Sequence, residues 1–253
     1  MIELQHRGAV AHLRIRRAEK KNAFTLAMWK SLLHHCLALP GSGARVLLLQ
    51  GERGSFCAGA DIAEMTQLVA NPAELAHNNG VVSQAQLALE HLGLPTVAVI
   101  DGPCFGGGLG LAAACDFRLA SSRASFAVTP ARLGLLYSLE DTRRLVRLLG
   151  EHAARRLLLR GERLDATTAQ AWGLLDALVP PEQLEATATA WANELAQSSR
   201  TSMAGLKATL GCLSGSGVHS EAQVRQAFDQ AFTGPDFTEG AAAFLARREP
   251  RFS

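Results

Sequence analysis

Two stretches of the chain repeat the same order of features: an apolar run of strand length, a glycine-rich loop and the start of a helix. The first runs from ARVLLLQG at 44–51 through GERGSFCAGAD at 51–61. The second runs from TVAVID at 96–101 through GPCFGGG at 102–108. Both strands are apolar on both faces, which is typical of a parallel sheet covered on both sides. Two such units predict an α/β core.

The segments outside these two units extend the core and then become mostly helical. Strands are expected at 2–7, 9–15, 116–121 and 124–128, and helices at 25–39, 81–93, 140–160, 166–173, 181–198, 201–213, 218–232 and 236–247. Pro180-Pro181 marks a junction before the last helices. We therefore expect an α/β core at 1–180 and a helical C-terminal subdomain at 181–253.

The composition argues against several classes of function. The 25 Lys and Arg residues nearly balance the 23 Asp and Glu residues, so the net charge of +2 does not favour nucleic-acid binding. Five scattered cysteines without a Cys-x-x-Cys pair suggest neither a disulfide framework nor a metal site. No apolar run approaches the roughly 20 residues that cross a bilayer, and the first residues lack the apolar segment of a signal peptide. A cytoplasmic protein without a membrane partner is expected.

The glycine-rich loops bring backbone N–H groups to the surface, because a missing Cβ permits close approach. Dinucleotide binding is one interpretation of GLGLAA at 108–113, but that fingerprint belongs to the first βα turn and this loop comes after position 100. A phosphate-binding P-loop is excluded, since no Gly-Lys-Ser or Gly-Lys-Thr follows the glycines. Two N–H donors converging on one oxygen would form an oxyanion hole, and two loops after consecutive strands favour that function over tight packing alone.

Six segments carry a further signal. In chain order they are KKNAF at 20–24, FCAGADIAEM at 56–65, PTVAVIDGPCFGGGLGLAAACDFRLAS at 95–121, ASFAVTPARLGLLY at 124–137, LDATTAQAWGLLDALVP at 164–180 and EGAAAFLARREPRF at 239–252. Together they resemble the crotonase (enoyl-CoA hydratase/isomerase) family over nearly the whole chain. The resemblance implies a crotonase-like fold with a repeated ββα core. It also implies an enzyme that binds an acyl-CoA thioester and stabilises the enolate formed at the α-carbon.

The resemblance assigns roles to residues of both loops and of the segment before the first helix. The thioester carbonyl would lie between the backbone N–H groups of Ala60 and Gly107. The residues expected to contact the substrate or its coenzyme A are Lys21, Asn22, Ala23, Ala58, Asp61, Ile62, Gly106, Thr129, Pro130 and Phe244. Phe244 would reach the nucleotide of a neighbouring subunit, because family members form trimers or dimers of trimers through a helical C-terminal layer. Coenzyme A enters as part of the substrate, and no separate cofactor or metal is implied.

The chain departs from the family at both acid–base positions. Hydratases of the family place one glutamate in the helix after the second loop and another after the SFxxPE-type segment, where two carboxylates can orient water and move the α-proton. Those positions are Gly110 and Pro130 in this chain. The missing carboxylates argue against ordinary enoyl-CoA hydration, and against isomerisation by the second glutamate.

Other side chains follow in the same segment. TPARLGLLY at 129–137 resembles the branch containing methylmalonyl-CoA decarboxylase, in which a tyrosine lies near the acyl carboxylate, so Tyr137 is a candidate acid. Glu140 and Asp141 stand at a predicted helix start, and Asp141-Thr142 resembles the aspartate-threonine pair of the family's aromatic acyl-CoA dehalogenase. Adjacent helical residues point about 100° apart, so at most one carboxylate faces the pocket. We expect Glu140 to be the acid–base residue, whereas acidic residues at such a position otherwise cap the helix.

Three functions are compatible with these residues: an isomerisation or addition using Glu140, the decarboxylation of a malonyl-type thioester using Tyr137, and acyl-CoA binding without turnover. The acyl group itself is not predicted. It depends on the shape of a pocket bordered by residues 65–90, whose sequence favours no single conformation.

Overall fold

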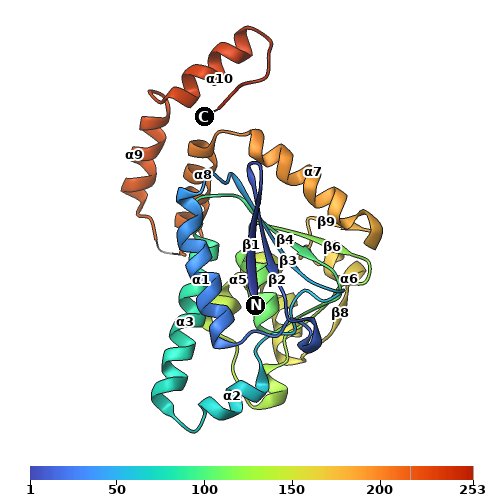
Figure 1. Ribbon diagram of the computed structural model, residues 1–253. Coiled ribbons are helices and arrows are strands. Elements are labelled where there is room, and N and C mark those ends of the chain that lie inside the picture. The colour runs from blue at the N-terminus through green and yellow to red at the C-terminus, as the bar shows by residue number, and fades with distance from the viewer. Residues whose placement is uncertain (217, 253) are drawn as a thin grey trace.

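The computed structural model describes residues 1–216 and 218–252. Its centre is a six-stranded sheet in the order β1-β2-β3-β4-β6-β9 (Figure 1). The strands are β1 (Ile2–Arg7), β2 (Val10–Ile15), β3 (Val46–Gly51), β4 (Thr96–Ile100), β6 (Phe117–Ser121) and β9 (Ala177–Val179). β1 and β2 pair antiparallel, and the other pairings in this sheet are parallel. This confirms the parallel arrangement predicted for the two strand–loop–helix units.

Ten α-helices are found in the described residues. They are α1 (Leu26–Ala38), α2 (Ile62–Leu68), α3 (Pro72–Glu90), α4 (Gly107–Ala114), α5 (Leu139–Leu159), α6 (Ala166–Ala171), α7 (Leu184–Gln197), α8 (Arg200–Leu213), α9 (Glu221–Ala231) and α10 (Pro235–Leu245). α5 is kinked at Gly150, whose φ of 73° and ψ of 164° are not helical. None of the helices in residues 1–216 and 218–252 is long and apolar enough to span a membrane.

Both faces of the large sheet are covered, and successive side chains of β3 show how. Leu47 and Leu49 point into the main core, which also holds buried side chains of α1, α3, α4 and α5. Leu48 points to the opposite face, where it joins a second apolar cluster with Leu184 and Ala188 of α7. The alternation follows from the pleat of a strand, and the double cover explains why β3 and β4 are apolar on both sides.

A smaller three-stranded sheet lies beside the second glycine loop. Its strands are β5 (Pro103–Phe105), β7 (Ser125–Ala127) and β8 (Leu164–Asp165), in that order. β5 is part of the second loop, and an isolated bridge between Cys57 and Cys104 ties it to the first loop. The small sheet therefore fixes one loop against the other.

The segment at 65–90 is more regular than its sequence predicts. The apolar spacing predicts a helix from 81, whereas α3 begins at Pro72 and α2 precedes it. The Asn71 side chain caps α3 by accepting hydrogen bonds from two amides of its first turn. Pro72 takes the first helical position, where a missing N–H costs no hydrogen bond. The first turns of α3 are mostly exposed, so they lack the apolar stripe that sequence periodicity detects.

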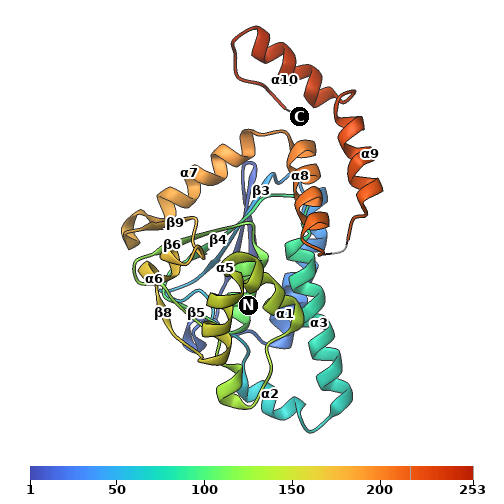
Figure 2. The ribbon, with the colours of Figure 1, turned by 180° about the vertical axis from the view of Figure 1, so that it is seen from behind.

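The last helices leave the sheet. Figures 1 and 2 both show α9 and α10 projecting beyond α8, away from the strands. α9 packs against α8. Large apolar side chains of these two helices and the turn between them are exposed: Phe228, Phe232, Phe237, Phe244 and Leu245. Gly217 and Ser253, which belong to the predicted helical subdomain, lie outside the described residues.

Candidate active site

The two glycine-rich loops meet at the ends of β3 and β4. The amides of Phe56 and Cys57 donate to the Pro103 carbonyl at 3.1 and 3.0 Å, and the Phe105 amide donates back to the Cys57 carbonyl at 2.9 Å. These bonds join the loops along their length. The predicted convergence of the two loops is therefore present in the structure.

The backbone amides of Ala60 and Gly107 lie side by side. A Cβ built on Gly107 would lie 4.0 Å from the Ala60 nitrogen, and one built on Gly59 would lie 3.4 Å from the Gly107 nitrogen. Gly59 and Gly106 have φ values of +99° and +50°, a region that favours glycine, so both turns depend on that residue type. The two turns bring these amides close together.

Neighbouring hydrogen bonds leave these two amides available. The Phe24 amide donates to the Gly59 carbonyl at 2.8 Å, and the Phe24 carbonyl accepts from the Asp61 amide at 2.9 Å. These two hydrogen bonds involve the residues before and after Ala60. Gly107 is the first residue of α4, where an amide has no partner within its own helix. Among the described residues, neither amide donates a hydrogen bond to another group. Both can therefore donate to one ligand oxygen.

Asp141 reaches Gly110, the position at which hydratases of the resembled family carry a glutamate. A Cβ built on Gly110 would lie 2.5 Å from Asp141 Oδ1 and 2.7 Å from Oδ2. Gly110 follows Gly107 by three residues, so the two share a face of α4 about one turn apart. A carboxylate thus lies beside the second glycine-rich loop, although it comes from α5 and not from α4.

The Asp141 carboxylate is buried and held on both oxygens. The residue is 4% exposed. Oδ1 accepts from Arg144 Nη1 at 2.8 Å, and Oδ2 accepts from Gln86 Nε2 at 3.3 Å. Burial raises the pKa of Asp141 above its usual value, and Arg144 offsets only part of that effect.

Arg144 extends this contact into a chain of alternating charges. The Arg144 side chain is 1% exposed, and its Nη2 contacts Glu90 Oε2 at 2.6 Å. The other oxygen of Glu90 pairs with Arg147 at 2.5 Å. Burial opposes the ionisation of Glu90, but the two guanidinium groups hold its pKa below the usual value. The network pairs the buried Asp141 carboxylate and the half-buried Glu90 carboxylate with a buried guanidinium.

Tyr137 lies between the second loop and Asp141. Its hydroxyl donates to the Gly106 carbonyl at 3.0 Å. Burial, followed by the nearby Asp141 carboxylate, raises the pKa of Tyr137 well above its usual value. The phenol therefore loses its proton less readily than a free tyrosine, and its role as an acid stays a prediction.

Glu140 lies on a different side of α5 from Asp141. It borders a small hollow with residues of the outer side of α3 and α5, including Leu87 and Arg143. Asp141, Arg144 and Leu145 form the buried face of α5 instead. The helix thus turns Asp141 inward, towards Gly110, and places Glu140 at the hollow; the predicted acid–base role of Glu140 stays a prediction. The buried stripe at 141, 144 and 145 has the three- and four-residue spacing of a helix face, a sequence signal that could have identified Asp141.

The segment expected to bind coenzyme A is anchored to the first loop. The Asn22 side chain is fully buried, donates to the Ser55 carbonyl at 2.6 Å and accepts from the Arg17 amide at 2.8 Å. The Ala58 amide donates to the Lys21 carbonyl at 3.0 Å. The Lys21 side chain is exposed. Asn22 therefore shapes the segment from inside, whereas Lys21 faces outward beside the loop.

The other expected contact residues frame the same region, apart from one. Asp61 caps α2 by accepting from the Glu64 amide and pairs with Arg17 at 2.6 Å, and this pairing lowers the pKa of Asp61. Ile62 is half exposed at the start of α2, and Ala23 is buried. The Gly106 amide donates to the Ala127 carbonyl of β7. Thr129 and Pro130 are half-buried at a 3₁₀ turn. Phe244 is 82% exposed on α10, which projects away from the sheet.

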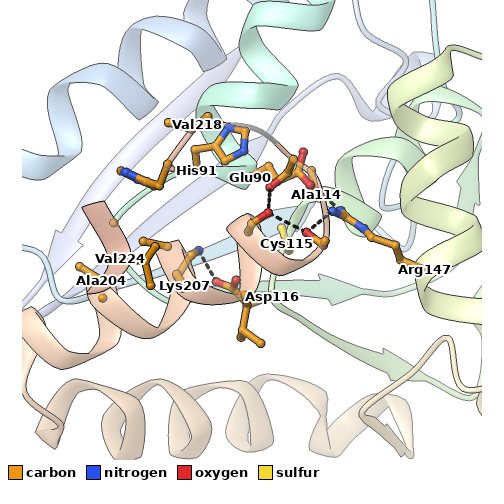
Figure 3. Close-up of a pocket in the computed structure, with 18 of the residues that line it drawn as sticks. Glu90, His91, Ala114, Cys115, Asp116, Arg147, Ala204, Lys207, Val218 and Val224 are labelled. Carbon is orange, nitrogen blue, oxygen red and sulfur yellow. Dashed lines mark hydrogen bonds and ion pairs between the residues drawn. The ribbon is translucent and has the colours of Figure 1, made fainter. Parts of the chain in front are cut away.

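A separate cavity of about 640 Å³ lies at the other end of α4 (Figure 3). Its lining includes Glu90, Cys115, Arg147, Lys207 and Val224. Most of its charged groups are already paired, as Figure 3 shows for the Lys207 ammonium group and the carboxylate of the adjacent aspartate. The cavity is not part of the predicted site. In the part of the chain that the structure describes, no three His, Cys, Asp or Glu side chains cluster as metal ligands.

Comparison with known proteins identifies the family. The chain matches the enoyl-CoA hydratase/isomerase family over residues 5–253 and belongs to it. The mevalonyl-coenzyme A hydratase sidH of Aspergillus fumigatus is 31% identical over 245 residues, which cover 95% of this chain and 90% of that protein. Members of this family are enzymes that act on acyl-CoA thioesters and usually form oligomers. The predicted family is confirmed.

Solved structures confirm the fold. The crystal structure of an enoyl-CoA hydratase/carnithine racemase from Magnetospirillum magneticum is similar with a TM-score of 0.93 and 30% identity, covering 100% of this chain and 95% of that one. That of an enoyl-CoA hydratase from Bacillus anthracis gives 0.91 and 29%, covering 99% and 98%. The crotonase-like α/β fold expected from the motifs is therefore correct.

Proposed function

We propose that this chain isomerises an enoyl-CoA by enolate chemistry, with Asp141 as its acid–base residue. The observation that carries the proposal is the Asp141 carboxylate at Gly110, one helical turn from the Gly107 amide. A glutamate at position 110 would meet this carboxylate. The chain keeps a carboxylate at the hydratase position and supplies it from a different helix.

The proposed reaction requires no co-reactant. The thioester oxygen of a 3-enoyl-CoA accepts hydrogen bonds from the amides of Ala60 and Gly107. The ionised Asp141 removes the α-proton, and the electrons of the broken C–H bond move through the carbonyl onto its oxygen to form the enolate. The electrons then return, the double bond moves from the 3 to the 2 position, and Asp141 gives its proton to the γ-carbon. One proton and one double bond change place, and the carboxylate is restored.

The surroundings of Asp141 suit a group that both takes and gives a proton. Burial raises its pKa, which brings it nearer the neutral pH at which acid–base groups work best. The two backbone donors supply the other half of the chemistry, since an oxyanion donor contributes about 2.7–4 kcal/mol to transition-state stabilisation. One carboxylate and two amides are sufficient for a proton shift.

The alternative reactions have less support. Decarboxylation would bring a second carboxylate beside Asp141, and the Tyr137 hydroxyl that should hold it already donates to Gly106. Hydration by a pair of carboxylates lacks its second member at Pro130. Binding without turnover uses the same amides and is distinguished by experiment.

The test is mass spectrometry and chromatography of 2-enoyl, 3-enoyl, malonyl and methylmalonyl-CoA after incubation with the protein in deuterated water. We expect conversion of the 3-enoyl to the 2-enoyl thioester with deuterium incorporation. A gain of water or a loss of carbon dioxide would assign hydration or decarboxylation instead. Binding with no change in any thioester would assign acyl-CoA binding without turnover.

Two adjacent substitutions provide the residue test. Asp141→Asn should lower the isomerisation rate by about 100-fold or more while thioester binding remains, because general acid–base groups contribute factors of that size. Glu140→Gln, the matched control on the outer side of α5, should leave the rate unchanged. The reverse pattern would restore Glu140 as the acid–base residue.

We also propose that residues 181–253 form a trimerisation subdomain and that the chain assembles as a trimer or a dimer of trimers. The exposed aromatic side chains of α9 and α10 support this assembly, since apolar surface of this kind is usually covered by a partner. Phe244 would then contact the coenzyme A of a neighbouring subunit. Sedimentation should give a trimer or hexamer, and a monomer would contradict the proposal.

A further inference from the structure

Gln86 is a buried polar side chain in an otherwise apolar part of α3. It is 2% exposed, and its neighbours one residue before and three after, Ala85 and Leu89, are fully buried in the main core. Its Nε2 donates to Asp141 Oδ2 at 3.3 Å across 55 residues of sequence. Burying an amide costs free energy unless it is hydrogen-bonded, and the bond to Asp141 offsets part of that cost.

Besides Gln86, the groups around the carboxylate are the hydroxyl of Ser138, which also accepts from the Asp141 amide at 3.0 Å, and several charged or ionisable side chains. Arg144 on α5 binds Oδ1, and Glu90 on α3 faces it through Arg144. Tyr137 lies before α5, and Cys104 of β5 lies behind Tyr137. α4 carries no titratable side chain in its sequence GGLGLAAA. Gln86 is thus the neutral partner that reaches Oδ2 from another helix, whereas Ser138 lies three residues before Asp141 at the start of its own helix.

A neutral amide has a property that Arg144 lacks. Arg144 can only donate, so it favours the ionised carboxylate. The end of a glutamine carries both a donor and an acceptor. Turning the amide by half a revolution replaces an N–H directed at a carboxylate with a carbonyl directed at a carboxylic acid. An acid–base residue passes through both forms in each turnover, and a glutamine can hold it in both.

Building on the proposed function of Asp141, we propose that Gln86 is the positioning residue that holds the Oδ2 of Asp141 in both protonation states. It orients the lone pair that takes the α-proton and, after amide rotation, the hydroxyl that returns it. Gln86 does not contact the substrate in this proposal.

The test compares Gln86→Met, which keeps the length of the side chain and removes both polar groups, with Gln84→Met on the exposed face of the same helix. The probe is but-3-enoyl-CoA, and kcat and KM are measured against pH. Loss of the amide donor should raise the pH of half-maximal kcat by about one unit and lower kcat about tenfold on the acidic side, with KM unchanged. Gln84→Met should match the unchanged protein.

A second variant keeps the test decisive if Gln86→Met does not fold. Gln86→Glu has the same shape and places a second carboxylate beside Asp141, so the half-maximal pH should rise further, by about two units. A pH profile that superimposes on that of the unchanged protein in either folded variant overturns the role of Gln86. If Asp141→Asn abolishes isomerisation in that case, only the role of Gln86 fails. If Asp141→Asn is fully active, the proposed function fails and the role of Gln86 fails with it.

Discussion

The glycine loops and the two last helices are built in opposite ways. In the loops, backbones pack without free space: a Cβ built on Gly108 would lie 2.3 Å from the Cys57 carbonyl oxygen. In α9, α10 and the turn between them, the rings of Phe228, Phe232 and Phe237 contact one another in series, at centroid separations of 5.2 and 5.9 Å, and each is more than half exposed.

The loops are fully packed by contacts within one chain, whereas the aromatic side chains of α9 and α10 are exposed in it. The joined glycine loops depend on contacts inside a single chain, so they should form without any partner. The aromatic series has no such cover among the described residues, and we expect its order to depend on assembly. Four predictions test the contrast.

The largest effect is expected inside the core. Arg144→Met leaves the buried Asp141 and the half-buried Glu90 without their shared guanidinium, which should lower the free energy of unfolding by about 3–5 kcal/mol. Both carboxylates would then bind protons more readily in the folded state. A raised folded-state pKa gives stability that is lost as pH rises, so the deficit should be larger at pH 8 than at pH 5.

Denaturant unfolding at the two pH values measures the effect. Arg155→Met on the exposed face of α5 is the matched control, since the Arg155–Glu151 pair is exposed and should contribute less than about 1 kcal/mol. Equal losses in the two variants would show that the buried network has no special weight.

The next effect is expected in the loop backbone. Gly108→Ala forces Cβ against Cys57 and should lower the free energy of unfolding by about 1–3 kcal/mol, because α4 must move away from the first loop. Most of the proposed isomerase activity should be lost with it. Gly80→Ala provides the control: it is exposed in α3 with no atom near its added methyl group, and helix propensity predicts a neutral or stabilising change. Thermal unfolding and thioester turnover are measured for both variants. Unchanged activity in Gly108→Ala would mean that the loops are not tightly coupled.

A smaller effect on the core is expected from the aromatic series. Phe232→Ser should leave hydrogen exchange in β3 and β4 unchanged within about 0.5 kcal/mol, because the ring packs on Phe228 and Phe237 and is 57% exposed. Exchange in α9 and α10 should become faster, and sedimentation should show weaker association. If protection also falls in the sheet, the two regions form one cooperative unit and the contrast is wrong.

The smallest effect concerns the end of the chain. Arg248 contacts Glu239 at 2.7 Å, and together with the Arg251 amide it lowers the pKa of Glu239 from 4.5 to about 2. A lowered carboxylate pKa gives stability that is present above the usual value and is lost as pH falls towards the folded one. The contact should therefore weaken between pH 4.5 and about 2. An NMR titration of the Glu239 carboxyl measures this, with Glu239→Gln as the pH-insensitive control, and an apparent pKa near 4.5 would contradict it.

The backbone part of the candidate site could be predicted from the sequence, and the side-chain part only in outline. The amides of Ala60 and Gly107 belong to local patterns, strand then glycines then helix, whose geometry follows from residues close in the chain. The choice between Glu140 and Asp141 depends on how α5 is rotated against α4. That rotation is set by packing between distant segments, and Gln86 shows it most clearly because its partner is 55 residues away.

The fold shows the same division. The parallel strands and the covered sheet follow from apolar runs that are local in sequence. The start of α3 was not predictable from periodicity, because Asn71 and Pro72 begin the helix where no apolar face is present. Capping signals carried that information, and the spacing of apolar residues did not.

The contact between Gly110 and Asp141 also limits how this chain can change. Side chains at positions 110 and 141 would occupy the same space. A single replacement of Gly110 by glutamate would therefore bring its Cβ within 2.5 Å of Asp141 Oδ1. A path to a hydratase arrangement must shorten the residue at 141 first and pass through a form with no carboxylate at that place. We therefore expect family members to carry this carboxylate either on α4 or on α5, and not at both positions.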